Sequence, residues 1–430
     1  MNRPQEHFLN TPRSFFHLTR LQTPFGERSL YDSVASCNRC GSCMQVCPVY
    51  RLRRTETDSP RGRNQAIRLA LEGKLKITEP VLQRSMEACT LCGRCSQMCA
   101  AQLPTAEHVL ATRRAFAKRR LPLLLQKILS LRGQKPILFE RTVQLGLRLR
   151  PIWKTVSVVP GMGWLKLAAK RIVKKRISLK TALKKEQIYT QEENPELIYL
   201  PSLEAEFLQP EIAVSSLRLL TAKGKTACWF NTACGLFEYV YGDLRQSKQL
   251  LRRLMYKHLH TEKGMLPLVT DSLDVYHFLK QAAQLFAPHK RLQQQADRFA
   301  RQVYFITDFF PEKGLTAAQI QLPVQLNTGT LFYRESTPVN QSISLCETLF
   351  EQNFVKCEYT GFDIPAFGYA FSTGNQNEPL MLEVVKQVAQ KQAKTVFTFS
   401  GLCALELNDA FRRFYPEAKA QHIVSITDKR

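Results

Sequence analysis

Two runs of four cysteines constrain this chain more than any other feature of its sequence. Both have the spacing Cys-x2-Cys-x2-Cys-x3-Cys; the members are Cys37, Cys40, Cys43 and Cys47 in the first run and Cys89, Cys92, Cys95 and Cys99 in the second. The chain holds thirteen cysteines in all, and its first residues show no apolar core of signal-peptide length. Because thiols of a chain that is not exported stay reduced, the clustered cysteines predict a metal centre rather than a disulfide framework.

The spacing within each run is the one that bacterial ferredoxins use for 4Fe–4S clusters. Three thiolates separated by two residues curl around one cubane, and the fourth points to the partner cluster. On this basis the first cluster takes Cys37, Cys40, Cys43 and Cys99, and the second takes Cys89, Cys92, Cys95 and Cys47. Gly41 and Gly93 each directly follow a cysteine and give the backbone the freedom that a tight turn requires. The sequence therefore predicts two interleaved 4Fe–4S clusters.

Zinc is the alternative metal for a segment so rich in cysteine. Zinc sites commonly use two cysteine pairs that a long loop separates, whereas each run here places four cysteines within eleven residues. The duplication of the full run favours clusters over zinc. One departure from the ferredoxin pattern is that Ala100 follows Cys99, where Pro48 follows Cys47. We expect a looser loop there, with no ligand lost.

The cysteine-rich segment is expected to carry electrons rather than to catalyse a reaction. It offers no evident acid, base or nucleophile, and two adjacent cubanes form a short path for electrons. The sequence has no Gly-x-Gly-x-x-Gly and no P-loop, so we expect no flavin or nucleotide site of its own. His7, His17 and His108 are expected at the surface, because cysteines already fill both clusters.

Residues 111–190 form a basic connector. The chain has a formal charge of +25, and this segment contains 21 Lys or Arg against two acids. Residues 164–179 alternate apolar and basic side chains as an amphipathic helix would. The alternatives are a surface without a partner, a nucleic-acid site and an anionic membrane face. The pattern favours a membrane or a membrane protein over nucleic acid, and we expect a cytoplasmic protein that can lie peripherally on the inner membrane.

The C-terminal half reads as two similar α/β units. Their expected elements are opening strands at 197–200 and 330–333, long helices at 245–258 and 378–392, inner strands at 267–270 and 395–399, and final strands at 305–308 and 425–428. Strands that alternate with helices predict parallel sheets. The predicted fold is therefore α+β. Its parts are a lead-in (1–30), a helical ferredoxin-like dicluster domain (31–110), the basic connector (111–190) and two repeats (191–325 and 326–430).

The motifs between the cysteine runs add a family resemblance. Asp-Ser-Pro-Arg-Gly-Arg at 58–63 and Leu-Glu-Gly at 71–73 stand in order between the runs. This arrangement resembles the iron–sulfur subunits of FAD-linked oxidases, such as those of glycolate oxidase, lactate utilisation and anaerobic glycerol-3-phosphate dehydrogenase. The resemblance is specific over 31–110 and weaker after 190. It implies an FAD-linked partner that oxidises a 2-hydroxy acid or a related substrate, and electron flow toward a quinone or another membrane carrier.

The C-terminal repeats depart from that family. Its members usually carry two repeats with a Cys-Cys-Gly turn and a later Cys-x-x-Cys, similar to heterodisulfide reductases. Of these positions the chain keeps Cys234, Cys357 and Cys403. Because a cubane needs four thiolates, we interpret the repeats as a degenerate docking region with these cysteines in its core, although a redox thiol or a third cluster is a competing interpretation.

Two further functions compete with the electron-transfer subunit: a catalytic reductase of the heterodisulfide type and a scaffold with structural clusters. Arg61 and Arg63 have two interpretations as well. They either steady the reduced clusters or bind a partner carboxylate, or they belong to a solvated first helical turn.

Overall fold

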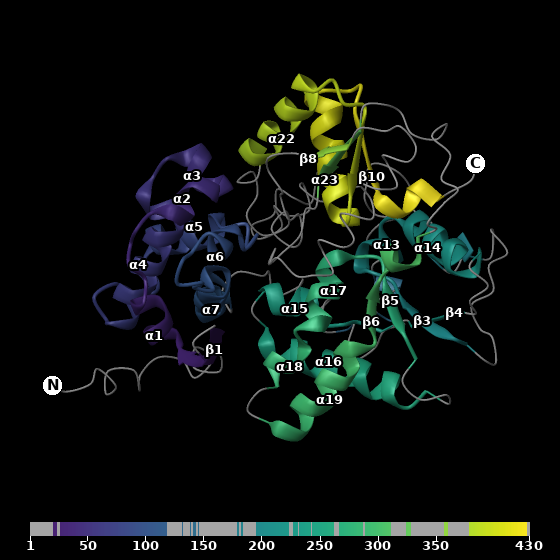
Figure 1. Cartoon of the computed structure of the whole chain (residues 1–430), viewed down its shortest axis with the longest axis horizontal. Coiled ribbons are helices and arrows are strands. Elements are labelled where there is room, and N and C mark those ends of the chain that lie inside the picture. The colour runs from purple at the N-terminus through teal and green to yellow at the C-terminus, as the bar shows by residue number, and fades with distance from the viewer. Residues whose placement is uncertain are drawn as a thin grey trace.

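The structure is a computed structural model of the 430-residue chain. Figure 1 shows a helical N-terminal domain beside two α/β units. The residues that the structure describes are 20–23, 26–117, 195–222, 227–230, 232–241, 243–261, 266–286, 289–310, 324–327, 357–359 and 378–427, with a few single residues between 131 and 183. Most of the basic connector, including the predicted helix at 164–179, thus lies outside the described residues, as do His7 and His17.

The N-terminal domain consists of short helices around the longer α4. Its elements are β1 (Arg20–Thr23), β2 (Gly26–Ser29), α1 (Leu30–Ala35), α2 (Ser42–Val46), α3 (Pro48–Arg53), η3 (Glu56–Asp58), α4 (Pro60–Leu71), α5 (Pro80–Ala88), α6 (Arg94–Gln97) and α7 (Thr105–Ala117). β1 and β2 pair antiparallel. Helix α4 packs against α1, α5 and α7. Buried side chains such as Ile67, Met86 and Val109 fill the space between these helices.

Helix α4 begins and ends where its sequence indicates. The Ser59 side chain accepts a hydrogen bond from the Gly62 amide at 2.9 Å, and Pro60 occupies the first turn. Gly73, with φ of 72°, follows the last turn. A Cβ atom at Gly62 would clash with the Glu56 carbonyl oxygen, so only glycine lets α4 start against η3. The predicted helix ahead of Cys89 is also present, as α5.

The C-terminal half contains two parallel sheets of the same topology. The first unit comprises β3 (Leu197–Leu200), α13 (Leu203–Phe207), α14 (Pro210–Ala222), β4 (Ala227–Trp229), α15 (Leu236–Tyr241), α16 (Leu244–Leu259), β5 (Leu268–Thr270), α17 (Leu273–Lys280), α18 (Ala282–Leu285), α19 (Lys290–Arg301), β6 (Val303–Phe305) and η5 (Ile306–Phe309). The second comprises β7 (Val324–Asn327), β8 (Cys357–Tyr359), α22 (Glu378–Gln390), β9 (Thr395–Thr398), α23 (Gly401–Phe414), β10 (Lys419–His422) and η8 (Ile423–Thr427). The strand orders are β4-β3-β5-β6 and β8-β7-β9-β10.

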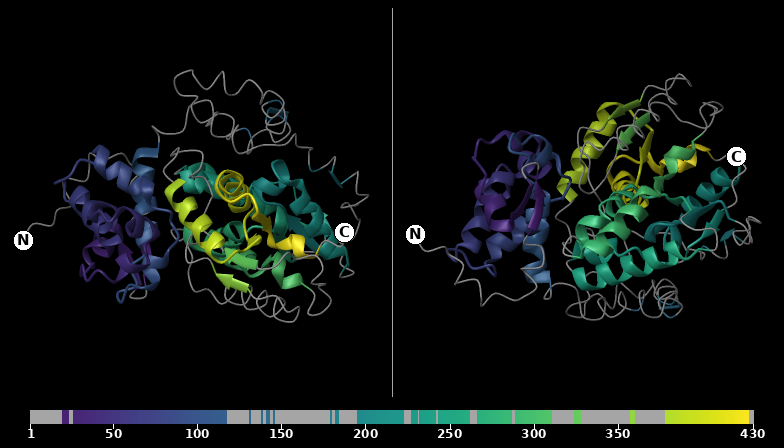
Figure 2. Two further views of the ribbon diagram at one scale, coloured as in Figure 1. Left: turned by 90° about the horizontal axis from the view of Figure 1, so that it is seen from above. Right: turned by 60° about the horizontal axis from the view of Figure 1, so that its bottom comes forward.

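These matching orders confirm the predicted α+β fold with a duplicated parallel α/β region. All pairs within the two sheets are parallel. Figure 2 shows both units on the same side of the helical domain. Among the described helices, none combines the length and the apolar character that crossing a membrane requires. The exact domain boundaries stay predictions.

The predicted final strands at 305–308 and 425–428 are wrong. β6 and β10 end earlier, at Phe305 and His422, and a 3₁₀-helix follows each. In the first unit the Asp308 carboxylate accepts a hydrogen bond from the Phe305 amide at 3.1 Å, which turns the backbone out of the sheet. In the second unit the Ser425 hydroxyl bonds the His422 carbonyl at 2.8 Å. The predicted opening strand at 330–333 lies outside the described residues.

The two α/β units meet at a buried polar interface. His422 Nε2 donates to the Asp271 carbonyl oxygen at 2.8 Å, and the Leu273 amide donates to the Phe399 carbonyl oxygen at 3.1 Å. The Asp271 carboxylate, directly after β5, accepts a hydrogen bond from the Tyr199 hydroxyl at 2.6 Å. The carboxyl ends of strands from both sheets therefore contribute to one hydrogen-bonded layer.

Glu204 makes the stability of this interface depend on pH. The side chain is buried, and within the described part of the chain its Oε1 has no hydrogen-bond partner. Burial, followed by the charges of Asp271 and Asp274, raises the pKa of Glu204 from 4.5 to about 8. Because the folded state favours the protonated acid, its contribution to stability is complete below pH 4.5 and is lost as the pH rises toward 8.

We therefore expect Glu204→Gln to stabilise the chain at pH 8 but not at pH 4.5. The expected gain in the free energy of unfolding at pH 8 is on the order of 3 kcal/mol. Urea unfolding at the two pH values, followed by circular dichroism, measures it. A difference between variant and wild type that is the same at both pH values would contradict the assigned pKa.

Candidate iron–sulfur site

The two cysteine loops have the same backbone conformation. Gly41 (φ 87°) and Gly93 (φ 76°) occupy the left-handed region and begin α2 and α6. Arg39 (φ 55°) and Leu91 (φ 58°), which precede the second cysteine of each run, are left-handed as well. Two left-handed residues thus flank the second cysteine in both runs and curl the loop around it. α2 and α6 also pack against each other, so the loops lie side by side.

A pocket between the runs gathers the thiols assigned to the second cluster. Its lining includes Cys89, Cys92 and Cys95 from the second run and Cys47 from the first. Its other polar lining residues are Arg63, Thr90 and Thr105. The pocket therefore brings together the four thiols that the ferredoxin spacing assigns to the second cluster.

The cysteines that contribute most to one another's pKa fall into the same two groups as the predicted clusters. Burial raises the pKa of Cys43 to about 11, and the next contributions come from Cys37 and Cys99. Cys99 belongs to the second run, so its effect on Cys43 agrees with the predicted first group of thiols. Cys40 is exposed, and a hydrogen bond with the Ser42 hydroxyl, 3.5 Å from its Sγ, lowers its pKa.

The second group shows the corresponding neighbours. Desolvation raises the pKa of Cys95, and Cys92, Cys89 and Cys47 contribute next. Burial therefore favours the protonated form of Cys95. Across the described residues, no three His, Cys, Asp or Glu side chains converge closely enough to share one metal ion. The eight thiols fit two clusters, each of which contains several irons held by four thiolates. Their assignment as ligands stays a prediction.

The two fourth cysteines sit in different local structures. Cys47 caps α3: its Sγ accepts a hydrogen bond from the Tyr50 amide at 3.5 Å, and Pro48 starts the helix. Cys99 precedes a turn in which the Gln102 amide bonds the Cys99 carbonyl at 2.7 Å. Ala100 lacks the fixed φ of proline. The chain therefore forms a turn after Cys99, whereas it forms helix α3 after Cys47.

Arg63 is a buried cation beside the second group of thiols. Its side chain is 1% exposed, its Nη1 lies 4.0 Å from Cys47 Sγ, and its Nε donates to the Ser85 carbonyl at 3.0 Å. Burial disfavours the charge, but Cys89, Cys47 and Asp58 outweigh it and raise the pKa of Arg63. The interpretation of Arg63 as part of a solvated first turn is therefore wrong, because long-range packing against α5 encloses the side chain.

Arg61 lies near the first group of thiols and is partly exposed. Its Nε is 2.8 Å from Glu56 Oε1, and its Nη1 donates to the Arg39 carbonyl at 3.2 Å. The first of these contacts holds the guanidinium along η3, and the second supports the loop that carries Cys40. Arg61 is thus a partly solvated residue that still holds the cysteine loop.

His108 is buried, which corrects the expected surface position. Its Nε2 lies 2.7 Å from the Ser33 hydroxyl and its Nδ1 2.9 Å from Asn64 Oδ1. Burial lowers the pKa of His108 to about 3, so the ring is neutral. Since an amide oxygen only accepts, Nδ1 carries the proton and Nε2 accepts from Ser33. The ring joins α1, α4 and α7 behind the thiols.

Sequence reasoning missed Arg113, which it counted with the basic connector. Its guanidinium is buried and donates to the carbonyl oxygens of Met86 and Cys89. α7 thereby fixes the end of α5 and the first residue of the second cysteine loop. In the C-terminal half, Cys234 and Cys403 lie in the hydrophobic core, as expected of small core residues.

Comparison with known proteins agrees with this geometry. Residues 33–103 match the 4Fe–4S dicluster domain family. This match covers both cysteine runs. Over 126 residues the chain is also 33% identical to the glycolate oxidase iron–sulfur subunit of Escherichia coli (strain K12). That match spans 28% of this chain and 30% of the relative. The resemblance to an iron–sulfur subunit of the glycolate oxidase type is confirmed, and no solved structure matches the chain.

Proposed function

We propose that this chain is the electron-transfer subunit of a flavoprotein complex. The observation that carries the proposal is the pocket in which Cys47 of the first run joins three thiols of the second. A dicluster domain with exchanged thiols holds two redox centres next to each other, which a purely structural site does not need.

The residues of the chain account for the behaviour that such a module needs. When bound, each 4Fe–4S cluster accepts and releases one electron. The cysteine loops hold the two sites adjacent, because each loop supplies a thiol to the other. Arg63 offsets added negative charge at the second site from within the core. Helices α4, α5 and α7 exclude water from its inner side.

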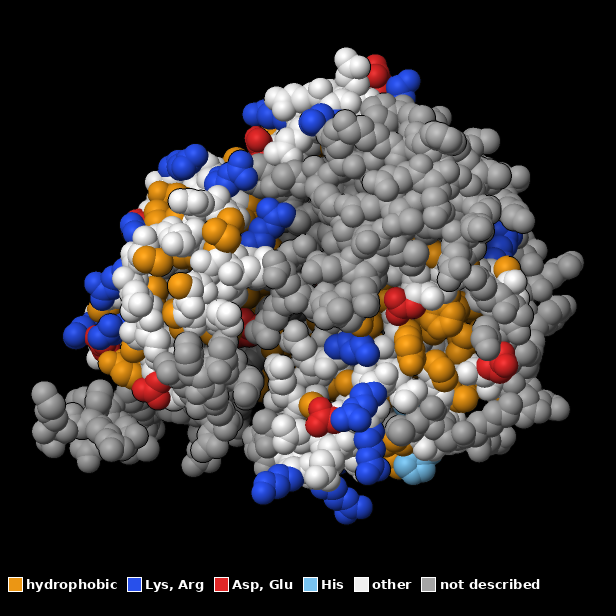
Figure 3. Space-filling model, viewed as in Figure 1, with side chains coloured by type: hydrophobic (Ala, Val, Ile, Leu, Met, Phe, Trp, Pro, Cys, Tyr) orange, Lys and Arg blue, Asp and Glu red, His pale blue; other side chains and the backbone are white. Residues whose placement is uncertain are grey.

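The proposed donor is an FAD-linked oxidase or dehydrogenase of a 2-hydroxy acid or similar substrate, and the electrons leave toward a quinone or another membrane carrier. The helical domain has a basic surface, as the face in Figure 3 shows. Among its described side chains, the exposed Lys and Arg are Arg39, Arg51, Arg53, Arg54, Lys74, Lys76 and Arg84. This surface suits an acidic partner or an anionic membrane, while nucleic acid is not favoured. The degenerate α/β units are proposed to dock the partner subunit.

Electron transfer is tested with a flavin donor. We expect photoreduced FAD to bleach the visible absorbance of the anaerobically purified chain and admission of an oxidant to restore it. Clusters that stay oxidised would favour the structural scaffold. Turnover of a disulfide substrate by the isolated chain would instead favour a reductase of the heterodisulfide type.

A further inference from the structure

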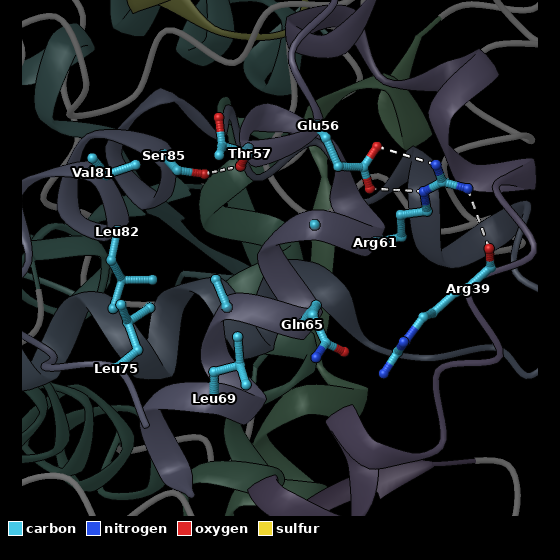
Figure 4. A pocket seen from close by; sticks show the side chains of 12 residues that line it. Arg39, Glu56, Thr57, Arg61, Gln65, Leu69, Leu75, Val81, Leu82 and Ser85 are labelled. Atoms are coloured by element: carbon cyan, nitrogen blue, oxygen red, sulfur yellow. Dashed lines mark hydrogen bonds and ion pairs between the residues drawn. The ribbon is translucent and has the colours of Figure 1, made fainter. Parts of the chain in front are cut away.

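A second cavity lies on the outer side of α4, away from the pocket between the cysteine runs. It has a volume of about 580 Å³, which is within the usual range of roughly 300–1,000 Å³ for small-molecule sites. Elements η3, α4 and α5 form it together with the first cysteine loop (Figure 4). None of the ligand thiols lines it, so it is a separate site.

The walls of this cavity differ from one end to the other. One end is apolar, and its side chains are Ala66, Leu69, Leu75, Val81 and Leu82. Figure 4 shows Leu69, Leu75 and Leu82 facing one side of the space and Arg39, Arg61 and Gln65 on the other. A ligand that fills the cavity is therefore amphiphilic, with an apolar body and a polar group that accepts hydrogen bonds.

The polar end adjoins the loop of the first cluster. Arg39 directly precedes Cys40, and Arg61 binds the Arg39 carbonyl at 3.2 Å. The Arg61 guanidinium is occupied by Glu56. In the part of the chain that the structure describes, the Arg39 guanidinium makes no hydrogen bond or ion pair, and so offers its donors to a ligand.

We propose that this cavity binds a quinone as the electron acceptor of the module. A quinone has a flat apolar ring, alkyl substituents and carbonyl oxygens that accept hydrogen bonds, which matches both ends of the cavity. The inference rests on the proposed function and specifies its acceptor. The bound quinone takes up two electrons from the reduced iron–sulfur module and two protons from water at the open mouth, and becomes the quinol. The flavoprotein donor resupplies the electrons.

Equilibrium binding of menadione to the full-length, cluster-loaded chain tests the proposal without electron transfer. Arg39→Gln removes the charged guanidinium at the polar end, and Val81→Trp fills the apolar rim, where the native side chain is 51% exposed. Arg84→Gln is the matched control, because Arg84 lies exposed on the same helix as Val81 and does not line the cavity. We expect at least about a tenfold loss of affinity in the first two variants and none in the control.

Two outcomes overturn the proposal: equal menadione affinity in all four proteins, or binding of decanoate without binding of menadione. The same samples are assayed for iron and for bleaching by photoreduced FAD. Normal iron and bleaching without menadione binding would refute the quinone site and leave the electron-transfer role intact. Missing iron or absent bleaching would instead refute the electron-transfer role, whatever menadione does.

Discussion

Replacing Cys47 by serine is expected to remove the second cluster and leave the first, so that the iron content falls from about eight atoms per chain to about four. The reason is that Cys47 lies in the pocket of Cys89, Cys92 and Cys95 although it belongs to the other run. Iron analysis and EPR of the dithionite-reduced variant measure the loss and show which cluster persists.

The comparison with other variants makes this test specific. Cys92→Ser is expected to leave the same EPR signal as Cys47→Ser, whereas Cys40→Ser and Cys99→Ser are expected to leave the other signal. Cys234→Ser is the control: this cysteine lies in the core of the C-terminal half, and its replacement should not change the iron content. If Cys47→Ser and Cys40→Ser left the same signal, each run would bind its own cluster and the exchange would be refuted.

Replacing Arg63 by glutamine is expected to lower the reduction potential of the second cluster by on the order of 100 mV. The guanidinium is fixed 4.0 Å from Cys47 Sγ and is shielded from water, so its charge stabilises the added electron strongly. A redox titration followed by EPR measures the potential of each cluster.

Two further variants separate charge from folding. Arg63→Lys keeps the charge and should retain most of the potential. Arg61→Gln should shift the first cluster by much less, because the Arg61 side chain is 33% exposed and already pairs with Glu56. Equal shifts for Arg61→Gln and Arg63→Gln, or no shift for either, would show that burial of the cation does not set the potential.

Local signals in the sequence predicted much of the secondary structure. Helix α4 was predictable because its cap, Ser59, and its stop, Gly73, act within a few residues of the helix. Strand β3 was predictable because its apolar run is short and buried. The final strands were not, because an apolar run does not reveal where a side chain such as that of Asp308 turns the backbone out of a sheet.

In the candidate site, too, local features were predictable from the sequence and long-range contacts were not. The spacing of the cysteines indicates both clusters and the exchange of the fourth thiol, since spacing is a local property. The burial of Arg63, His108 and Arg113 could not be predicted in this way. Charge marks such residues as exposed, and only contacts between distant segments, such as that of His108 with Ser33, enclose them. The cavity beside α4 likewise exists only once η3, α4 and α5 are packed.

The most direct test of the two interleaved clusters is the metal and sulfide content of the full-length chain purified without oxygen. We predict a brown protein with about eight iron and eight sulfide per chain, and an EPR spectrum of two interacting 4Fe–4S clusters after reduction. A colourless protein that contains zinc and no sulfide would contradict the account.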